Sequence, residues 1–64
     1  SGLEFHIGKK AIVIDTVGLN SGRVDFAGEY WNARSDSPIQ KGDSCEIVGF
    51  KGLTCYVKPL TKTT

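Results

Sequence analysis

The sequence predicts an all-β domain folded as one small five-stranded barrel, and two observations lead to this prediction. Every long segment alternates apolar and polar residues with a period near two, which is typical of strands that bury one face. Eight glycines divide these segments into short pieces joined by tight turns. The expected strands cover residues 9–17, 22–27, 30–35, 44–50 and 53–59. Closure into a barrel would remove the exposed edges of such short strands.

Length and composition indicate a single small globular domain. Sixty-four residues, 39% of them hydrophobic and 23% charged, can form one modest core and are too apolar for a disordered chain. The longest apolar run, residues 11–14, is far shorter than the roughly 20 residues of a membrane-spanning helix, and no secretory signal is recognisable. The formal net charge of +1 disfavours a general polyanion binder, because phosphate neutralisation supplies most of the affinity for nucleic acids.

The second and third strands are expected to form a hairpin whose two-residue turn is Ala27-Gly28 or Gly28-Glu29. With either turn, the same side chains of the two strands point to the same face of the hairpin. The apolar face then carries Val24, Phe26, Trp31 and Ala33. The polar face carries Arg23, Asp25, Tyr30, Asn32 and Arg34. This parity favours a core position for Trp31 over an exposed platform on which a nucleic-acid base could stack.

The fourth and fifth strands are expected to meet at a Lys51-Gly52 turn. Strict alternation would place Cys45 and Ile47 opposite to the other apolar side chains, so we predict a β-bulge at Val48-Gly49. The bulge turns Cys45, Ile47, Phe50, Leu53, Cys55 and Val57 inward. In this register Cys45 lies across from Val57, and Cys55 from Ile47.

The connection between the two hairpins, residues 35–43, contains Pro38 and Gly42 and is too short for a helix. Ile39 is its main apolar residue, and we expect this side chain to close one open end of the barrel.

The chain offers little for catalysis or metal binding. The two cysteines are expected to be diagonal rather than paired, which favours free buried thiols and a reducing compartment. His6, the single histidine, is expected on a solvated entry segment, where it could serve neither a catalytic triad nor a zinc site. No glycine-rich phosphate loop is present. We therefore expect no catalytic residue, no metal site and no cofactor.

Several ordered motifs are nevertheless distinctive. The run from Gly22 to Ala33 (GRVDFAGEYWNA) resembles the G-x-V-x-(apolar)-x-G-x-x-W-x-A core of the NfeD C-terminal domain. The likeness continues through Pro38-Ile39-x-x-Gly42 and the closing hairpin, and it covers roughly residues 7–60. The chain departs from the family where Cys45 and Cys55 replace the usual Val and Leu, and where Asn20 replaces a frequent Pro.

The resemblance to NfeD implies an OB-like barrel that lacks the helix usually found between the third and fourth strands. It implies a flexible N-terminal segment or cloning remnant at residues 1–6, the barrel at residues 7–60 and a tail at residues 61–64. Family members are bacterial or archaeal and are usually membrane proteins in which this domain follows transmembrane helices. Longer forms carry a serine-protease domain upstream. The free thiols favour a cytoplasmic location for the domain.

The resemblance also implies a function, since NfeD proteins pair with stomatin- and flotillin-like (SPFH) membrane scaffolds. We expect a non-catalytic protein-interaction domain that uses Arg23, Tyr30, Asn32 and Arg34 on the polar face of the hairpin. Residues 18–22 form an alternative contact. An oligonucleotide-binding OB module using the same side chains is a second hypothesis, and a passive stabilising or oligomerising role is a third.

Overall fold

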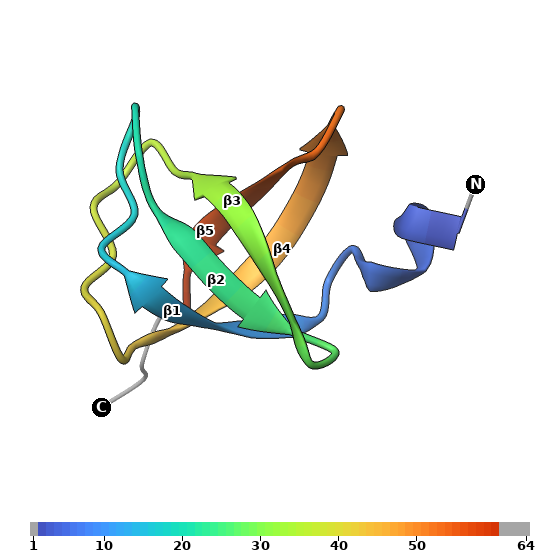
Figure 1. Ribbon diagram of the computed structural model, residues 1–64, viewed down its shortest axis with the longest axis horizontal. Helices are drawn as coiled ribbons and strands as arrows, with labels where there is room; N and C mark the ends of the chain where they lie inside the picture. Colours follow the sequence, from blue (N-terminus) through green and yellow to red (C-terminus); the bar gives the residue numbers. More distant parts are fainter. Residues whose placement is uncertain (1, 61–64) are drawn as a thin grey trace.

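The computed structural model describes residues 2–60 and contains a short 3-10 helix followed by five strands (Figure 1). In chain order the elements are η1 (Gly2–His6), β1 (Lys10–Asp15), β2 (Arg23–Phe26), β3 (Glu29–Arg34), β4 (Ser44–Lys51) and β5 (Thr54–Pro59). All five predicted strands are present, and the all-β class is confirmed. The predicted tail at residues 61–64 lies outside the described residues. None of the helices within residues 2–60 is long and apolar enough to cross a membrane.

The strands form a closed barrel in the order β1-β2-β3-β5-β4. Neighbouring strands are antiparallel except β3 and β5, which run parallel with Ala33 across from Cys55. Pairing of β1 with β4, which places Ala11 across from Cys45, closes the ring. Residues 35–43 connect β3 to β4 without a helix. The predicted OB-like barrel lacking that helix is therefore confirmed.

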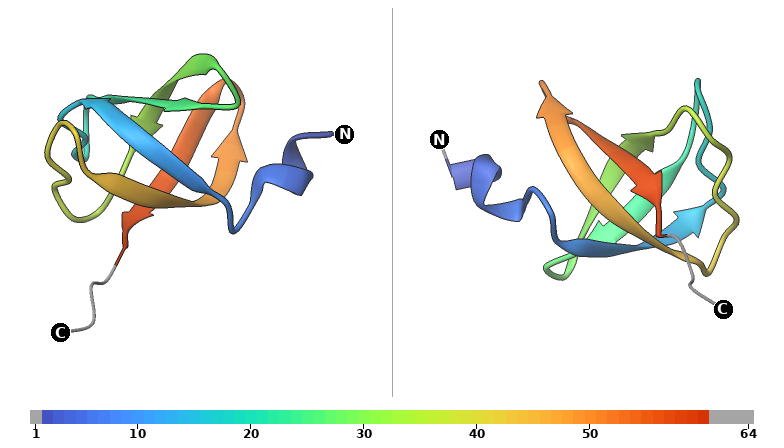
Figure 2. Two further views of the ribbon diagram at one scale, coloured as in Figure 1. Left: turned by 90° about the horizontal axis from the view of Figure 1, so that it is seen from below. Right: turned by 180° about the vertical axis from the view of Figure 1, so that it is seen from behind.

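The barrel has two different ends (Figures 1 and 2). The η1 end carries η1 and the turns at residues 27–28 and 52–53, whereas the loop end carries residues 16–22 and 35–43. At the loop end, Val17 and Ile39 exchange two backbone hydrogen bonds of 2.9 Å, and only 4% of Ile39 is exposed. The prediction that Ile39 closes one end of the barrel is confirmed.

The core follows the predicted alternation along each strand. Its buried side chains are Ala11, Val13, Val17, Val24, Phe26, Ala33, Ile39, Cys45, Ile47, Cys55 and Val57. Trp31 and Phe50 are partly buried and pack against this set. The inward facing predicted for Trp31 is correct, because its ring stacks on Phe26 with the centroids 5.3 Å apart.

The β2–β3 hairpin turns at Ala27-Gly28, since Phe26 pairs with Glu29. Both turn residues have positive φ, 54° for Ala27 and 77° for Gly28, as a type I′ turn requires. Ala27 is the non-glycine residue with positive φ within residues 2–60. The left-handed conformation costs an alanine roughly 1–2 kcal/mol, so this turn stores strain.

Replacing Ala27 with Asn should stabilise the protein. Asn tolerates positive φ better than Ala, and Asn-Gly is a preferred pair for this turn. We expect Ala27→Asn to raise the free energy of unfolding by about 0.5–1 kcal/mol, which corresponds to a melting temperature higher by roughly 2–8 °C. Thermal unfolding followed by circular dichroism measures the shift. Gly28→Ala is the matched control and should lower the melting temperature, since it adds a second strained residue.

The β4–β5 hairpin contains the predicted bulge but not the predicted turn. The pairing shifts between Ile47 and Gly49, so Val48 and Gly49 together face Tyr56. Lys51 pairs with Thr54, and the turn is therefore Gly52-Leu53. Gly52, with a φ of 61°, takes the first central position, where a type II′ turn places glycine.

This shift of one residue corrects two predictions. Leu53 was expected to point inward, but it lies at the tip of the turn with 80% of its surface exposed. The cysteines also have other neighbours than predicted, because Cys45 pairs with Pro59, and Cys55 with Phe50. Ile47 instead pairs with Val57.

Candidate interaction surface

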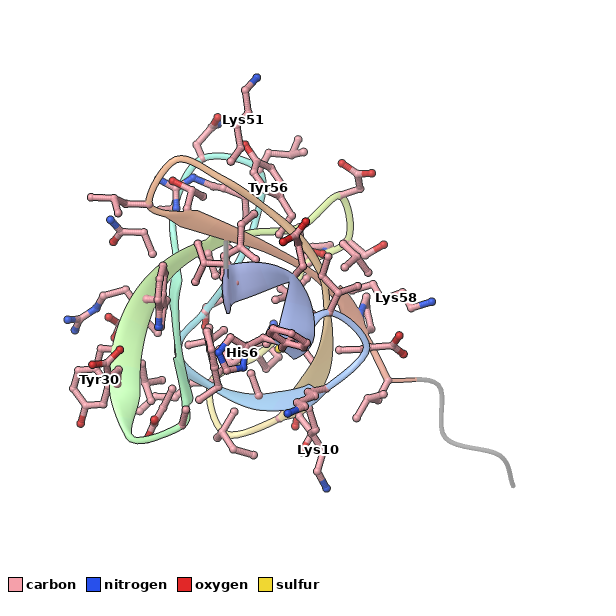
Figure 3. All side chains as sticks on the ribbon, turned by 90° about the vertical axis from the view of Figure 1, so that its right-hand side faces the viewer. His6, Lys10, Tyr30, Lys51, Tyr56 and Lys58 are labelled. Atoms are coloured by element: carbon pink, nitrogen blue, oxygen red, sulfur yellow. The ribbon has the colours of Figure 1, made fainter. Side chains whose placement is uncertain are left out.

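The four predicted contact residues lie together on the outer face of β2 and β3. Arg23 pairs with Asn32 across the two strands, and Asp25 pairs with Tyr30. Tyr30 has 67% of its surface exposed, and Figure 3 shows it pointing away from the barrel. The structure thus groups these residues, as the sequence alternation implies. Whether they contact a partner is a separate proposal.

Arg23 is held in place by two contacts. Its Nε donates a hydrogen bond of 2.6 Å to Oδ2 of Asp15. Its guanidinium carbon also lies 5.9 Å from the centroid of the Tyr30 ring, at the limit of a cation–π contact. The ion pair depends on an irregularity that the sequence did not reveal, since the β1–β2 register shifts between Val13 and Asp15. Because both side chains are about half exposed, the pair orients Arg23 more than it stabilises the fold.

Arg34 is less available than its three neighbours. It is half-buried, and its Nη1 donates a hydrogen bond of 2.7 Å to the carbonyl oxygen of Ala33. Its pairing partner across the parallel ladder is Tyr56, an exposed residue of β5. The polar face therefore continues from β2 and β3 onto β5.

A shallow hollow of about 410 Å³ opens at one end of this face, lined by Arg23, Tyr30, Trp31, Asn32 and Leu53. Leu53 was absent from the sequence-based set because it was assigned to the core. The exposed edge of Trp31 was also missed, because the alternation of residues along a strand predicts which way a side chain points but not how deeply it is buried. The mixture of Tyr, Trp, Arg and an exposed Leu is typical of the residues that contribute most to protein–protein interfaces.

An aromatic cluster lies beside this hollow at the η1 end. It contains His6, Phe26, Trp31 and Phe50, with ring centroids 5.0 Å apart for His6 and Phe26 and 5.3 Å apart for Trp31 and Phe50. Viewed from this end, His6 lies in the middle of the ring of strands (Figure 3). The predicted solvated position of His6 is therefore wrong, because its half-buried ring packs on the aromatic side chains of the barrel.

Both cysteines are free and buried in the core, as predicted. The Cys45 thiol donates to the carbonyl oxygen of Ala11 over 3.6 Å. Burial raises the pKa of Cys45 to about 11 and that of Cys55 to about 12. Such thiols stay protonated and unreactive at neutral pH. Within residues 2–60, no three His, Cys, Asp or Glu side chains are grouped closely enough to hold a metal ion.

These features define a class of protein: a small OB-like barrel with an aromatic, arginine-bearing outer face. Comparison with protein families then identifies the family. Residues 3–59 match the model of the NfeD-like C-terminal, partner-binding domain, so the chain belongs to the NfeD family.

Known relatives support this membership. The chain is 36% identical over 58 residues to an uncharacterized protein of Methanocaldococcus jannaschii, covering 89% of this chain but only 42% of that protein. The fold is similar to the C-terminal domain of stomatin operon partner protein 1510-C from Pyrococcus horikoshii, with a TM-score of 0.82, 35% identity, and coverage of 97% and 98% of the two chains.

A second solved structure has a similar fold. It is the soluble domain of a membrane protein implicated in regulation of membrane protease activity from Corynebacterium glutamicum. Its TM-score is 0.83 at 29% identity, and the match covers 88% of this chain and 94% of the other.

Proposed function

We propose that this chain is a non-catalytic adaptor that binds a stomatin- or flotillin-type (SPFH) membrane scaffold protein. The observation that carries the proposal is the match of residues 3–59 to a domain described as partner-binding, together with the likeness to a stomatin operon partner protein. We further propose that a segment outside this chain attaches the whole protein to a membrane, with the barrel on the cytoplasmic side. The similarity to the soluble domain of a membrane protein supports the attachment, and the two free thiols support the location.

We propose the outer face of β2 and β3 as the binding surface. Tyr30 supplies a large exposed ring that needs few rotatable bonds to be ordered, and Asn32 supplies donors and an acceptor beside it. Arg23 is oriented by Asp15, so binding would order it at little further entropic cost. Arg34 borders the same surface from its half-buried position.

Loss of this surface should weaken partner binding strongly. In a pull-down with the soluble domain of a stomatin-type protein from the same organism, we expect Tyr30→Ala with Arg34→Glu to weaken binding at least about tenfold, because interface residues of this type contribute about 2 kcal/mol or more. Tyr30→Ala with Asn32→Ala removes two exposed side chains and leaves the Arg34 hydrogen bond intact. It should have a similar effect without disturbing the fold.

Two further variants make the result specific. Lys58→Glu changes an exposed charge on β5 and should bind as the wild type does. Leu19→Ser tests the alternative contact at residues 18–22. If both Tyr30 variants bind normally, this face is not the binding surface, and a loss with Leu19→Ser alone would transfer the contact to the loop end.

A further inference from the structure

We propose that the η1 end of the barrel is a lipid-contacting face that places Phe5, Ile7 and Leu53 in the headgroup region of a membrane. This inference rests on the proposed attachment of the whole protein to a membrane, and it goes beyond partner binding because it assigns a second surface, which adjoins the β2–β3 face at Leu53. It also fixes an orientation, with the η1 end towards the lipid and the loop end away from it.

The two most exposed large apolar side chains of the described residues, Leu53 and Phe5, lie at this end, together with Ile7. Leu53 is 80% exposed, Phe5 78% and Ile7 49%. Phe5 belongs to η1, Ile7 follows it, and Leu53 lies in the β4–β5 turn, and both η1 and this turn are at the same end of the barrel (Figures 1 and 2). A small hollow at this end is lined by Leu3, Glu4, Ile7, Phe50 and Gly52. Single exposed apolar residues are ordinary, but a group at one end of so small a domain indicates a contact surface.

The segment that carries Phe5 and Ile7 is attached to β4 by backbone hydrogen bonds and a ring contact. The backbone N–H of Gly8 donates a hydrogen bond of 2.8 Å to the carbonyl oxygen of Ile47. The N–H of Ile47 donates one of 2.9 Å to the carbonyl oxygen of Lys9. His6 and Phe50 anchor the same segment through their ring contact, with centroids 6.5 Å apart. Since the segment is already ordered, little conformational entropy is lost when its apolar residues enter lipid.

Three lysines lie near the apolar residues in the sequence. Lys9 and Lys10 follow Ile7 and Gly8 after the end of η1, and Lys51 precedes the turn that carries Leu53. Viewed from this end, Lys10 and Lys51 project to opposite sides of the barrel (Figure 3). Lysine stems can pack along apolar surface while their ammonium groups reach lipid phosphates, which is typical of interfacial segments. Glu4 and Glu29 lie at the same end, so we expect only modest dependence on anionic lipid.

The direction of the chain gives the same orientation. The matched family model describes a C-terminal domain, and the corynebacterial relative is the soluble domain of a membrane protein. In a protein so organised, the rest of the chain reaches the domain from its N-terminal side. In this fold the N-terminal side is the η1 end (Figures 1 and 2). A membrane tether and the exposed apolar group would therefore be on the same side of the barrel.

Partition of the isolated chain into lipid vesicles tests the proposal without any protein partner. The wild type should co-sediment with vesicles of phosphatidylcholine at millimolar lipid, and binding should increase by no more than about twofold when phosphatidylglycerol is added. Trp31, the single tryptophan, lies beside Leu53 in the outer hollow. Its emission should therefore be quenched by phospholipids brominated near the headgroup end of their acyl chains.

The variant Phe5→Ser with Leu53→Ser should lower the partition coefficient at least about tenfold. Leu19→Ser removes an apolar side chain that is 68% exposed at the loop end, and it should change partition by less than about twofold. Absence of wild-type partition, or equal losses in the two variants, would refute the proposal. If the double variant Phe5→Ser with Leu53→Ser no longer binds the partner in the pull-down but still partitions into vesicles as the wild type does, the face contacts the protein partner and not lipid. Failure of the Tyr30 variants in the pull-down concerns partner binding alone.

Discussion

Substitution of Gly22 by Ala should remove a large part of the stability of the barrel. Gly22 has a φ of 135°, which side-chain-bearing residues rarely adopt, and a Cβ added there would lie 2.5 Å from Cα of Val17. Because the nearest atom belongs to the backbone, no change of side-chain rotamer could relieve the clash. Val17 is fully buried and bonded to Ile39, so it cannot move without opening the loop end.

Backbone strain and overpacking each cost about 1–3 kcal/mol, so the expected loss from Gly22→Ala is about 3 kcal/mol or more. A domain of this size has only about 3–10 kcal/mol of stability in total. Urea unfolding followed by Trp31 fluorescence measures the difference. Gly18→Ala is the matched control in the same loop, since a Cβ there would contact nothing within 4 Å. We expect it to change stability by less than about 1 kcal/mol. If Gly22→Ala unfolds at the same urea concentration as the wild type, the close approach of Gly22 to Val17 is contradicted.

The second large effect is expected at alkaline pH, where the protein should lose stability because of its two core thiols. Burial raises the pKa of Cys45 to about 11 and of Cys55 to about 12, from a value of 9.0 in the unfolded chain. Between these values the unfolded chain releases the thiol protons while the folded protein retains them. The contribution is therefore complete below pH 9 and is lost as the pH rises through the folded pKa values.

The measurement is the free energy of unfolding from urea titrations at several pH values between neutrality and pH 11, under reducing conditions. Cys45→Ala with Cys55→Ala will have lower stability at neutral pH, since it loses packed core atoms. Its decline above pH 9 should, however, be clearly shallower than that of the wild type. Parallel declines in the two proteins would show that other groups, such as Tyr and Lys, control alkaline unfolding.

Much of the barrel could be predicted from the sequence because a closed sheet separates inside from outside at every second residue. The facing of Val24, Phe26, Trp31 and Ala33 follows from that rule alone, and so does the grouping of Arg23, Tyr30 and Asn32. The bulge at Val48-Gly49 was also predictable, since without it the buried side chains of β4 and β5 would not share a face. These features depend on local pattern, which a single sequence contains.

The misplaced features depend on choices that local pattern does not determine. Gly52 can serve in a two-residue turn either at Lys51-Gly52 or at Gly52-Leu53, so the glycine does not decide between them. The hydrophobicity of Leu53 then wrongly favoured the turn that would bury it. The shift between Val13 and Asp15, which brings Asp15 to Arg23, leaves no glycine or proline as a signal. The packing of His6 on Phe26 and Phe50 joins distant parts of the chain and required the assembled barrel to be recognised.

The parallel pairing of β3 with β5 has a consequence for how the protein reaches its native state. Neither this pairing nor that of β1 with β4 is local, so the ring closes only after chain segments far apart in the sequence have met. Topologies of this kind fold slowly for their length, because loop entropy is lost before the distant contacts form. During synthesis, β5 is the last strand to leave the ribosome. Until it does, β3 and β4 each have one edge without a partner strand. Productive folding should therefore begin after translation of the last strand, and the incomplete intermediate would be the species most exposed to aggregation.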